Sequence, residues 1–204
     1  MESERKVLVA GARQLGLDLT PDVQSKLLEY MALMQKWNKV YNLTAIRSGP
    51  EMVTHHLLDS LAVLPHLWAG RWLDVGCGGG LPGIVLAIMQ PDWDFTLLDS
   101  NSKKTGFVQQ VAIQLGLKNV RVHTGRVEEW KEETRFDGII SRAFTELANF
   151  FRLTEGLLAT EGRWAAMKGK MEEEIPSQYR IDHIITLHVP GLDASRSLVI
   201  AGRK

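Results

Sequence analysis

Hydrophobic residues recur at helical spacing through the first third of the chain. Three stripes of this kind are separated by polar breaks, the first break being Thr20-Pro21-Asp22 and the second the loop at 47–50. Pro21 suits the first turn of a helix, where its missing N–H costs nothing. The apolar positions are Leu8, Ala12, Leu15 and Leu19; then Val23, Leu27, Tyr30, Met31, Met34 and Trp37; then Val53, Leu57, Leu61, Leu64 and Trp68. We therefore expect three amphipathic helices that pack their stripes on a core.

From residue 71 onward, short apolar runs alternate with helical stretches. Gly116 follows one helical stretch at the position that favours a left-handed cap. The expected strands are 72–75, 95–99, 120–124, 136–141 and 163–168, and the expected helices are 81–89, 102–115 and 146–153. This alternation predicts right-handed crossovers and a parallel sheet with helices on both faces.

The chain ends on a different pattern. Two strand-like runs, 181–189 and 196–201, are separated by a loop around Pro190-Gly191 that is too short for a helical crossover. They should therefore pair antiparallel. An α/β fold with a mostly parallel sheet and such a C-terminal hairpin is typical of class I methyltransferases. We expect residues 1–69 to form a helical extension packed on a core of residues 70–204, in one compact unit.

Composition limits the setting in which the protein works. The 204 residues are 45% hydrophobic, with no apolar run long enough to span a membrane, and the charged N-terminus does not resemble a secretory signal. The single cysteine, Cys77, excludes an internal disulfide. We therefore expect a cytoplasmic protein with no membrane partner. Because 24 basic residues balance 24 acidic ones, any nucleic-acid partner must meet a local basic face.

A glycine-rich segment, 74–84, leaves the first strand of the predicted sheet and enters the next helix. Glycines at 76, 78 and 80 let a ligand approach the backbone, and the helix N-terminus offers free amide donors. Asp99 ends the following strand, where a carboxylate can accept hydrogen bonds from both hydroxyls of a ribose. Loop and acid together predict an adenosine-containing ligand.

The glycine spacing admits two cofactors. Gly78, Gly80 and Gly83 also satisfy the dinucleotide pattern, so NAD is a rival. In a dinucleotide site the first glycine follows the strand directly. Here that residue is Gly76, and Leu81 stands where the third glycine of that register belongs. The register therefore favours S-adenosylmethionine.

The segment after the fourth strand narrows the methyl acceptor. Methyltransferases of exocyclic amines commonly carry Asn or Asp, two prolines and an aromatic residue there, whereas this chain has Ser141-Arg142-Ala143-Phe144. A cysteine nucleophile for C5 of pyrimidines is also missing, since Cys77 lies in the glycine loop. Both absences favour an acceptor that is already nucleophilic, such as guanine N7. A small-molecule methyltransferase and a sensor that only binds S-adenosylmethionine remain alternatives.

Five segments together resemble the RsmG (GidB) family. They are residues 37–46 (WNKVYNLTAI), 56–61 (HLLDSL), 74–84 (DVGCGGGLPGI), 125–128 (GRVE) and 141–143 (SRA). The resemblance runs from about Leu27 to about Ile200. It implies methyl transfer to N7 of one guanine in the 530 loop of 16S ribosomal RNA, yielding 7-methylguanosine and S-adenosylhomocysteine. The implied partner is 16S RNA or a small-subunit particle, and we expect a monomer.

The resemblance also implies which residues contact S-adenosylmethionine: Gly76, Leu81, Val127, Glu128 and Arg142. The loop pattern adds Gly78 and Asp99. Arg142 follows the fourth strand, where its guanidinium could hold a carboxylate or a phosphate, and it is our candidate for positioning the reactants. No side chain is assigned a certain catalytic role.

Four basic residues, Lys103, Arg126, Lys168 and Arg196, are candidates for RNA contacts. Three of them stand at or near the ends of predicted strands, and Lys103 opens a helix beside Asp99. The six histidines show no spacing typical of a metal site, so we expect no metal. His56 and Asp59 lie three residues apart, and we expect them to pair and to hold the helical segment onto the sheet near Asn42.

Overall fold

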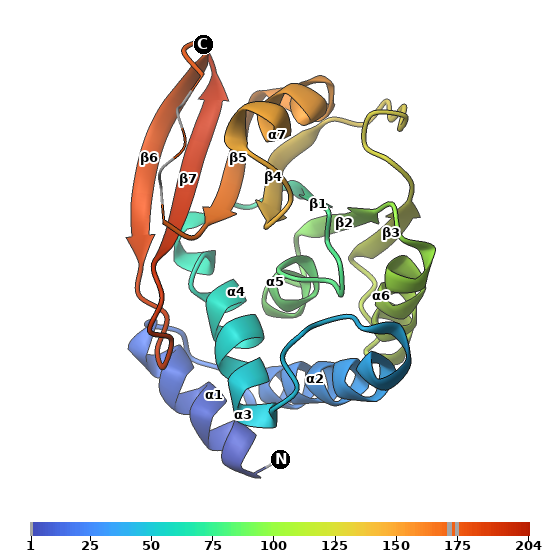
Figure 1. The fold of residues 1–204 in the computed structure, drawn as a ribbon, viewed down its shortest axis with the longest axis vertical. Helices are drawn as coiled ribbons and strands as arrows, with labels where there is room; N and C mark the ends of the chain where they lie inside the picture. Colours follow the sequence, from blue (N-terminus) through green and yellow to red (C-terminus); the bar gives the residue numbers. More distant parts are fainter. Residues whose placement is uncertain (1, 171–172, 174–175) are drawn as a thin grey trace.

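The computed structural model describes residues 2–170, 173 and 176–204, and it contains a seven-stranded sheet. Figure 1 shows the sheet above the N-terminal helices. The strand order is β3-β2-β1-β4-β5-β7-β6. The strands are β1 Arg71–Val75, β2 Asp94–Asp99, β3 Val120–Thr124, β4 Phe136–Arg142, β5 Leu158–Lys168, β6 Tyr179–Leu187 and β7 Arg196–Arg203. Strands β1 to β5 pair in parallel, and β7 is antiparallel to both β5 and β6. The predicted parallel sheet and its C-terminal hairpin are confirmed.

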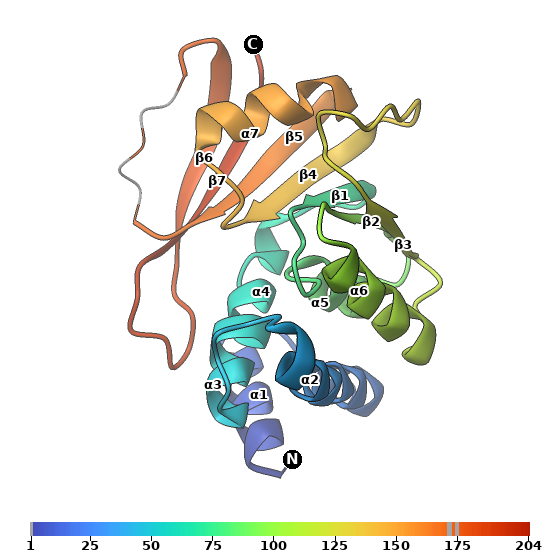
Figure 2. The ribbon, with the colours of Figure 1, turned by 45° about the vertical axis from the view of Figure 1, so that its right-hand side comes forward.

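Helices cover both faces of the sheet (Figure 2). The helical segments are α1 Glu2–Gln14, α2 Pro21–Tyr41, α3 Gly49–Met52, η1 Val53–Leu58, α4 Asp59–Leu61, η2 Leu64–His66, α5 Gly83–Met89, α6 Ser102–Gln114, α7 Leu147–Thr154 and η3 Glu155–Leu157. Helix α7 and the turn η3 pack with the hydrophobic cluster of one face, and the other helices pack with the larger cluster of the opposite face. No helix in the described ranges is long and apolar enough to cross a membrane.

Local sequence signals set the ends of the two helices beside the site. Helix α2 is capped at its start by Thr20, whose hydroxyl oxygen accepts the Val23 N–H at 3.3 Å, and at its end by Asn42 in the left-handed conformation. Helix α6 begins after Asn101, whose side-chain oxygen accepts the N–H groups of Lys103 and Lys104. Both helices are therefore fixed at the ends that face the carboxyl edge of the sheet.

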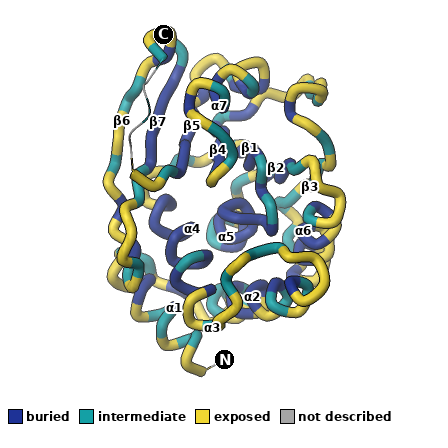
Figure 3. Tube along the Cα trace, viewed as in Figure 1, coloured by how far each residue is buried: buried dark blue, intermediate teal, exposed yellow. Residues whose placement is uncertain are grey.

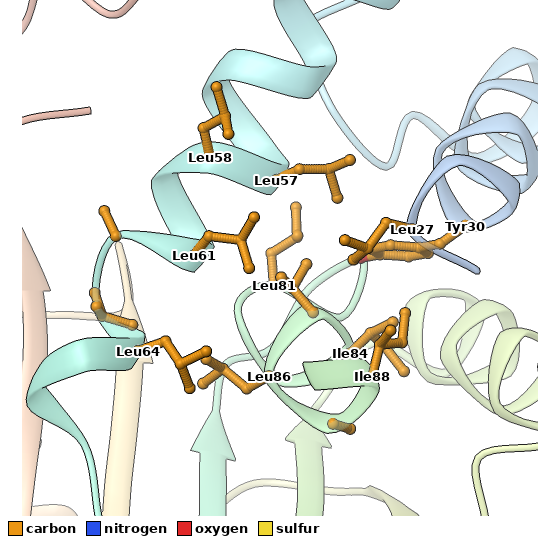
Figure 4. Packing of buried hydrophobic residues seen from close by; sticks show 14 of the residues in the cluster. Leu27, Tyr30, Leu57, Leu58, Leu61, Leu64, Leu81, Ile84, Leu86 and Ile88 are labelled. Carbon is orange, nitrogen blue, oxygen red and sulfur yellow. The ribbon is translucent and has the colours of Figure 1, made fainter. Parts of the chain in front are cut away.

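The N-terminal helices share one hydrophobic core with α5 and the sheet. Leu27 and Tyr30 from α2 and Leu57 from η1 meet Leu81 and Ile84 beside the glycine loop (Figure 4). The Tyr30 hydroxyl also donates to the carbonyl oxygen of Gly79 at 2.7 Å. Figure 3 shows α5 almost wholly buried between these layers. The helical extension thus packs directly on the loop that we expect to bind the cofactor.

The third predicted helix is not a single α-helix. Its stripe spans α3, a π-helical turn at η1, the short α4 and the 3₁₀ turn η2, and Trp68 lies beyond them as a half-buried side chain. Pro65 cannot donate the backbone hydrogen bond that would continue α4, so the α-helix ends before it. The π-helical turn has no signature that hydrophobic spacing reveals.

Candidate functional site

The glycine loop is held in place by its own backbone and by two carboxylates. Gly76 and Gly78 have φ values of +69° and +56°, which glycine adopts without strain. The Gly78 N–H donates to Asp99 at 2.9 Å, and the Gly83 N–H donates to the buried Asp74 at 2.8 Å. A side chain at position 83 would also collide with Asp74 and Leu97. The loop therefore presents its open side to the carboxyl end of the sheet.

A cavity of about 320 Å³ opens beside this loop, and we call it the glycine-loop cavity. Its walls come from the ends of β1, β2 and β3 and from the residues that follow β4. It is lined by Gly76, Gly78, Leu98, Asp99, Ser100, Lys104, Gly125, Arg126, Val127, Glu128, Ala143 and Phe144. Five of the seven residues predicted to contact the cofactor, all but Leu81 and Arg142, therefore meet in one cavity.

Leu81 and Arg142 lie outside the glycine-loop cavity. The side chain of Leu81 points into the shared core, between the N-terminal helices and α5 (Figure 4). Arg142 ends β4 and lines a second cavity on the other side of Ala143. For these two residues the cofactor contact stays a prediction.

The second cavity, which we call the arginine cavity, has a volume of about 410 Å³. It lies between the N-terminal helical segment and the carboxyl ends of β4 and β5, and its lining residues are Ile46, His55, His56, Asp59, Arg142, Ala143, Met167, Lys168, Gly169 and Arg196. Two of the basic residues predicted to contact RNA, Lys168 and Arg196, face it together with Arg142. Arg126 faces the glycine-loop cavity instead, and Lys103 lines neither cavity.

A single buried carboxylate joins the two arginines of this cavity. Asp59 is 2% exposed; its oxygens lie 3.1 Å from Nη1 of Arg142 and 2.9 Å from Nε of Arg196. The side chains of these arginines are 22% and 26% exposed, so the rest of each guanidinium reaches the cavity. Arg142 also donates to the carbonyl oxygen of His55 at 3.1 Å. Asp59 therefore ties α4 to β4 and β7 and fixes both guanidinium groups.

The predicted pairing of His56 with Asp59 is wrong. His56 Nε2 instead lies 2.9 Å from the hydroxyl of Thr44. Asp59 accepts hydrogen bonds from Arg142 and Arg196. Because His56 stands in the π-helical turn, residues three apart do not stack there as they do on an α-helix. His56 still connects the helical segment to the chain near Asn42, through Thr44, whereas Asp59 connects it to β4 and β7 through the two arginines.

Burial shifts the protonation of three groups beside the cavities. It lowers the pKa of His56 to about 4, so the imidazole is neutral at pH 7. It raises the pKa of Asp74 to about 7, with the Gly83 N–H acting in the opposite direction. Burial also raises the pKa of the Cys77 thiol, which agrees with a loop cysteine without a chemical role.

Lys168 is fixed by contacts rather than free in solvent. Its ammonium group donates to the carbonyl oxygen of Thr145 and to Glu173, each at 2.7 Å. Glu173 in turn accepts the Leu147 N–H at 2.7 Å. These bonds hold one amine at the mouth of the arginine cavity.

Ala143 lines both cavities and joins them. Its φ of +53° is unusual for a residue with a Cβ, and such strain is often found at functional sites. Phe144, the next residue, packs over Gly76, where a Cβ would come within 2.6 Å of its ring. Ala143, His55 and Lys104 also line the cavities, although the sequence did not indicate these residues. Only their positions next to Arg142, His56 and Lys103 could have indicated them.

Comparison with known proteins agrees with this architecture. The family described as rRNA small subunit methyltransferase G (GidB) matches residues 23–199. The "Ribosomal RNA small subunit methyltransferase G" proteins of Methylobacillus flagellatus and Laribacter hongkongensis are 53% and 50% identical to this chain. The matches cover 94% and 97% of this chain and 95% and 98% of those proteins.

Solved structures support the fold. A SAM-dependent methyltransferase from Thiobacillus denitrificans in complex with S-adenosyl-L-homocysteine superposes with a TM-score of 0.56 at 12% identity. The match covers 84% of this chain and 98% of that one. Because the family model matches residues 23–199 and relatives of about 50% identity cover nearly the whole chain, the chain belongs to the rRNA small subunit methyltransferase G family.

Proposed function

We propose that this protein transfers the methyl group of S-adenosylmethionine to N7 of a single guanine in the 530 loop of 16S ribosomal RNA. The products are 7-methylguanosine and S-adenosylhomocysteine, and the work takes place in the cytoplasm. The observation that carries the proposal is the junction at Ala143. There, a cavity lined by the glycine loop and Asp99 meets a cavity lined by Arg142, Lys168 and Arg196.

The residues of the glycine-loop cavity fit the nucleoside half of S-adenosylmethionine, which supplies an electrophilic methyl group on sulfur. A Cβ at Gly78 would meet no atom within 4 Å, so the loop leaves open space there. Asp99 can accept hydrogen bonds from ribose hydroxyls while it still accepts the Gly78 N–H. Val127 offers an apolar contact for the adenine, and Glu128 lies beside it.

The arginine cavity suits a nucleotide rather than a neutral metabolite. Three cationic groups line it, and Asp59 and Glu173 neutralise them only in part. Fixed guanidinium and ammonium groups are typical phosphate contacts. Guanine N7 carries a lone pair in its neutral form, so the protein has to orient the base and exclude water but has no proton to remove.

The direct test is incubation with methyl-labelled S-adenosylmethionine and small subunits, or 16S RNA, that lack base modification. We expect label at one position of the 530 loop, recovered as 7-methylguanosine. Label in small metabolites and none in RNA would overturn the proposal in favour of a small-molecule enzyme. Binding of S-adenosylmethionine without any transfer would instead indicate a sensor.

Replacement of Asp99 by alanine is expected to weaken S-adenosylmethionine binding about thirtyfold, the loss expected when hydrogen bonds to a charged group are removed. The change also frees the Gly78 N–H, which loosens the loop. Calorimetric titration measures the effect. Asp94→Ala, at the opposite end of the same strand and exposed, should bind as the wild type does. Equal affinities for both variants would contradict the assigned ribose contact.

Replacement of Lys168 by methionine is expected to lower the slope of log K for RNA binding against log salt by about one unit, because one phosphate contact is lost. Filter binding with 16S RNA at several salt concentrations gives the slope. Lys118→Met, in the turn before β3, is the matched control and should leave it unchanged. An unchanged slope for Lys168→Met would remove this residue from the RNA contacts.

A further inference from the structure

We propose that the C-terminal end of α2, the loop that follows it and the N-terminal end of α6 form a docking surface for single-stranded RNA that flanks the target nucleotide. We call it the α2–α6 rim, and it consists of Lys39, Val40, Tyr41, Arg47 and Lys103. The inference rests on the proposed function. It names the part of the protein that holds the RNA outside the arginine cavity.

Two adjacent hydrophobic side chains are exposed on this rim. Val40 is 70% and Tyr41 39% exposed, whereas Ile113 and Ile184, the other exposed large hydrophobic residues of the described ranges, lie singly on the far half of α6 and on β6. The Tyr41 ring is held by aromatic contacts. It lies 5.3 Å from the ring of Trp37, which itself lies 5.5 Å from that of Phe107. A supported, partly exposed aromatic ring is a suitable platform for a stacked base.

The packing of α2 against α6 brings Lys103 to the same surface. The two helices run antiparallel: Glu29 of α2 meets Gln114 at the end of α6, and Trp37 meets Phe107 one turn after its start. The next turn of α2 therefore carries Tyr41 toward the first turn of α6, where Lys103 stands exposed. Figure 2 shows these two helix ends on the same side of the molecule. Lys103, which lines neither cavity, thereby gains a place in the site.

The charge of the rim indicates an anionic partner. Lys39, Arg47 and Lys103 are exposed, and within the described residues none of them has an acidic partner. Unpaired cations and an exposed aromatic ring on one surface are the combination found in proteins that bind single-stranded nucleic acid. A protein partner could pack against Val40 and Tyr41, but it would need acidic side chains to pair with the three cations.

The rim is continuous with the arginine cavity through Ile46. That residue lines the arginine cavity and also a neighbouring hollow of about 320 Å³ that contains Lys39 and Arg47. Asn38 fixes the intervening loop, because its side chain exchanges two hydrogen bonds of 2.9 Å with the backbone of Thr44. A strand whose guanine enters the arginine cavity can therefore continue over a rigid loop to Tyr41.

The test compares rim variants with matched controls on unmodified 16S RNA and on small subunits. Lys39→Ala with Lys103→Ala should lower the slope of log K against log salt by about 1.4 units, since each phosphate contact to a single strand contributes about 0.7. Tyr41→Ala should weaken RNA binding between about fivefold and a hundredfold, and Tyr41→Phe should restore it. Lys118→Ala and Ile113→Ala, outside the rim, are the charge and hydrophobic controls. Affinity for S-adenosylmethionine, measured in parallel, should stay unchanged in every variant and shows that each is folded.

The outcomes separate the rim from the proposed function. If the wild type methylates RNA and the rim variants bind RNA with the affinity of the wild type, the docking role of the rim is overturned while the proposed function stands. If rim variants lose activity on small subunits but bind naked RNA normally, the rim contacts ribosomal protein and the RNA assignment is overturned. If the wild type methylates no RNA, the proposed function fails and the rim fails with it.

Discussion

Replacement of Asp59 by alanine is expected to lower the free energy of unfolding by about 3 kcal/mol and to reduce methyl transfer. The carboxylate is buried between two guanidinium groups, and removing it leaves both without their counter-charge. The arginines are about one quarter exposed, so water relieves part of the cost and the loss lies at the lower end of the range for buried pairs. Urea denaturation at pH 7 measures the change.

Asp182 provides a matched control for this experiment. It also bridges two arginines, Arg163 at 3.2 Å and Arg180 at 2.6 Å, but their side chains are about half exposed. Asp182→Ala should therefore cost less than about 1 kcal/mol. Equal losses for the two variants would mean that burial of Asp59 adds nothing. A stable Asp59→Ala protein with full activity would remove this residue from the site altogether.

Periodic and local signals made most of the fold predictable. Strands β1, β4 and β7 are mostly buried because both faces of the sheet are covered there, as the burial of Trp72 through Val75 shows, whereas the edge strands β3 and β6 keep exposed positions. The glycine-loop cavity was equally accessible from sequence. Gly76, Gly78 and Asp99 stand at strand ends, and parallel strands bring their carboxyl ends to one edge.

The arginine cavity depends on contacts between segments far apart in the sequence. Asp59 meets Arg142 and Arg196 across 83 and 137 positions, and no local pattern encodes such distances. The π-helical turn and the left-handed Ala143 likewise do not follow from residue preference, since alanine rarely has a positive φ and π-turns have no marked spacing of apolar residues. The sequence therefore indicated Arg142 as a site residue, but Asp59, which binds it, was predicted to pair with His56.

Asp74 is expected to make the protein less stable as the pH rises from about 4 to about 7. Burial raises its pKa from 3.8 to about 7 in the folded state. Over that window the folded carboxyl keeps a proton that the unfolded chain has released, so stability falls with increasing pH. The full shift corresponds to about 4 kcal/mol.

His56 acts in the opposite direction over nearly the same window. Burial lowers its pKa from 6.5 to about 4. Between these two pH values the imidazole is protonated in the unfolded chain but neutral in the folded protein. Stability from this residue therefore rises between about pH 4 and 6.5, by about 3 kcal/mol. We expect the contributions of Asp74 and His56 to the pH dependence of the unfolding free energy to cancel largely in the wild type, so that neither is visible there.

Two variants separate these contributions. Asp74→Asn keeps an oxygen for the Gly83 N–H, and its unfolding free energy minus that of the wild type should increase from pH 4 to pH 7. His56→Gln keeps a polar group for Thr44, and its difference should increase as the pH falls from 6.5 to 4. Differences are compared because the other titrating groups cancel in them. A flat difference for Asp74→Asn would mean that the carboxyl is ionised throughout. The negative charge beside the glycine loop would then be permanent, rather than one that appears near neutral pH.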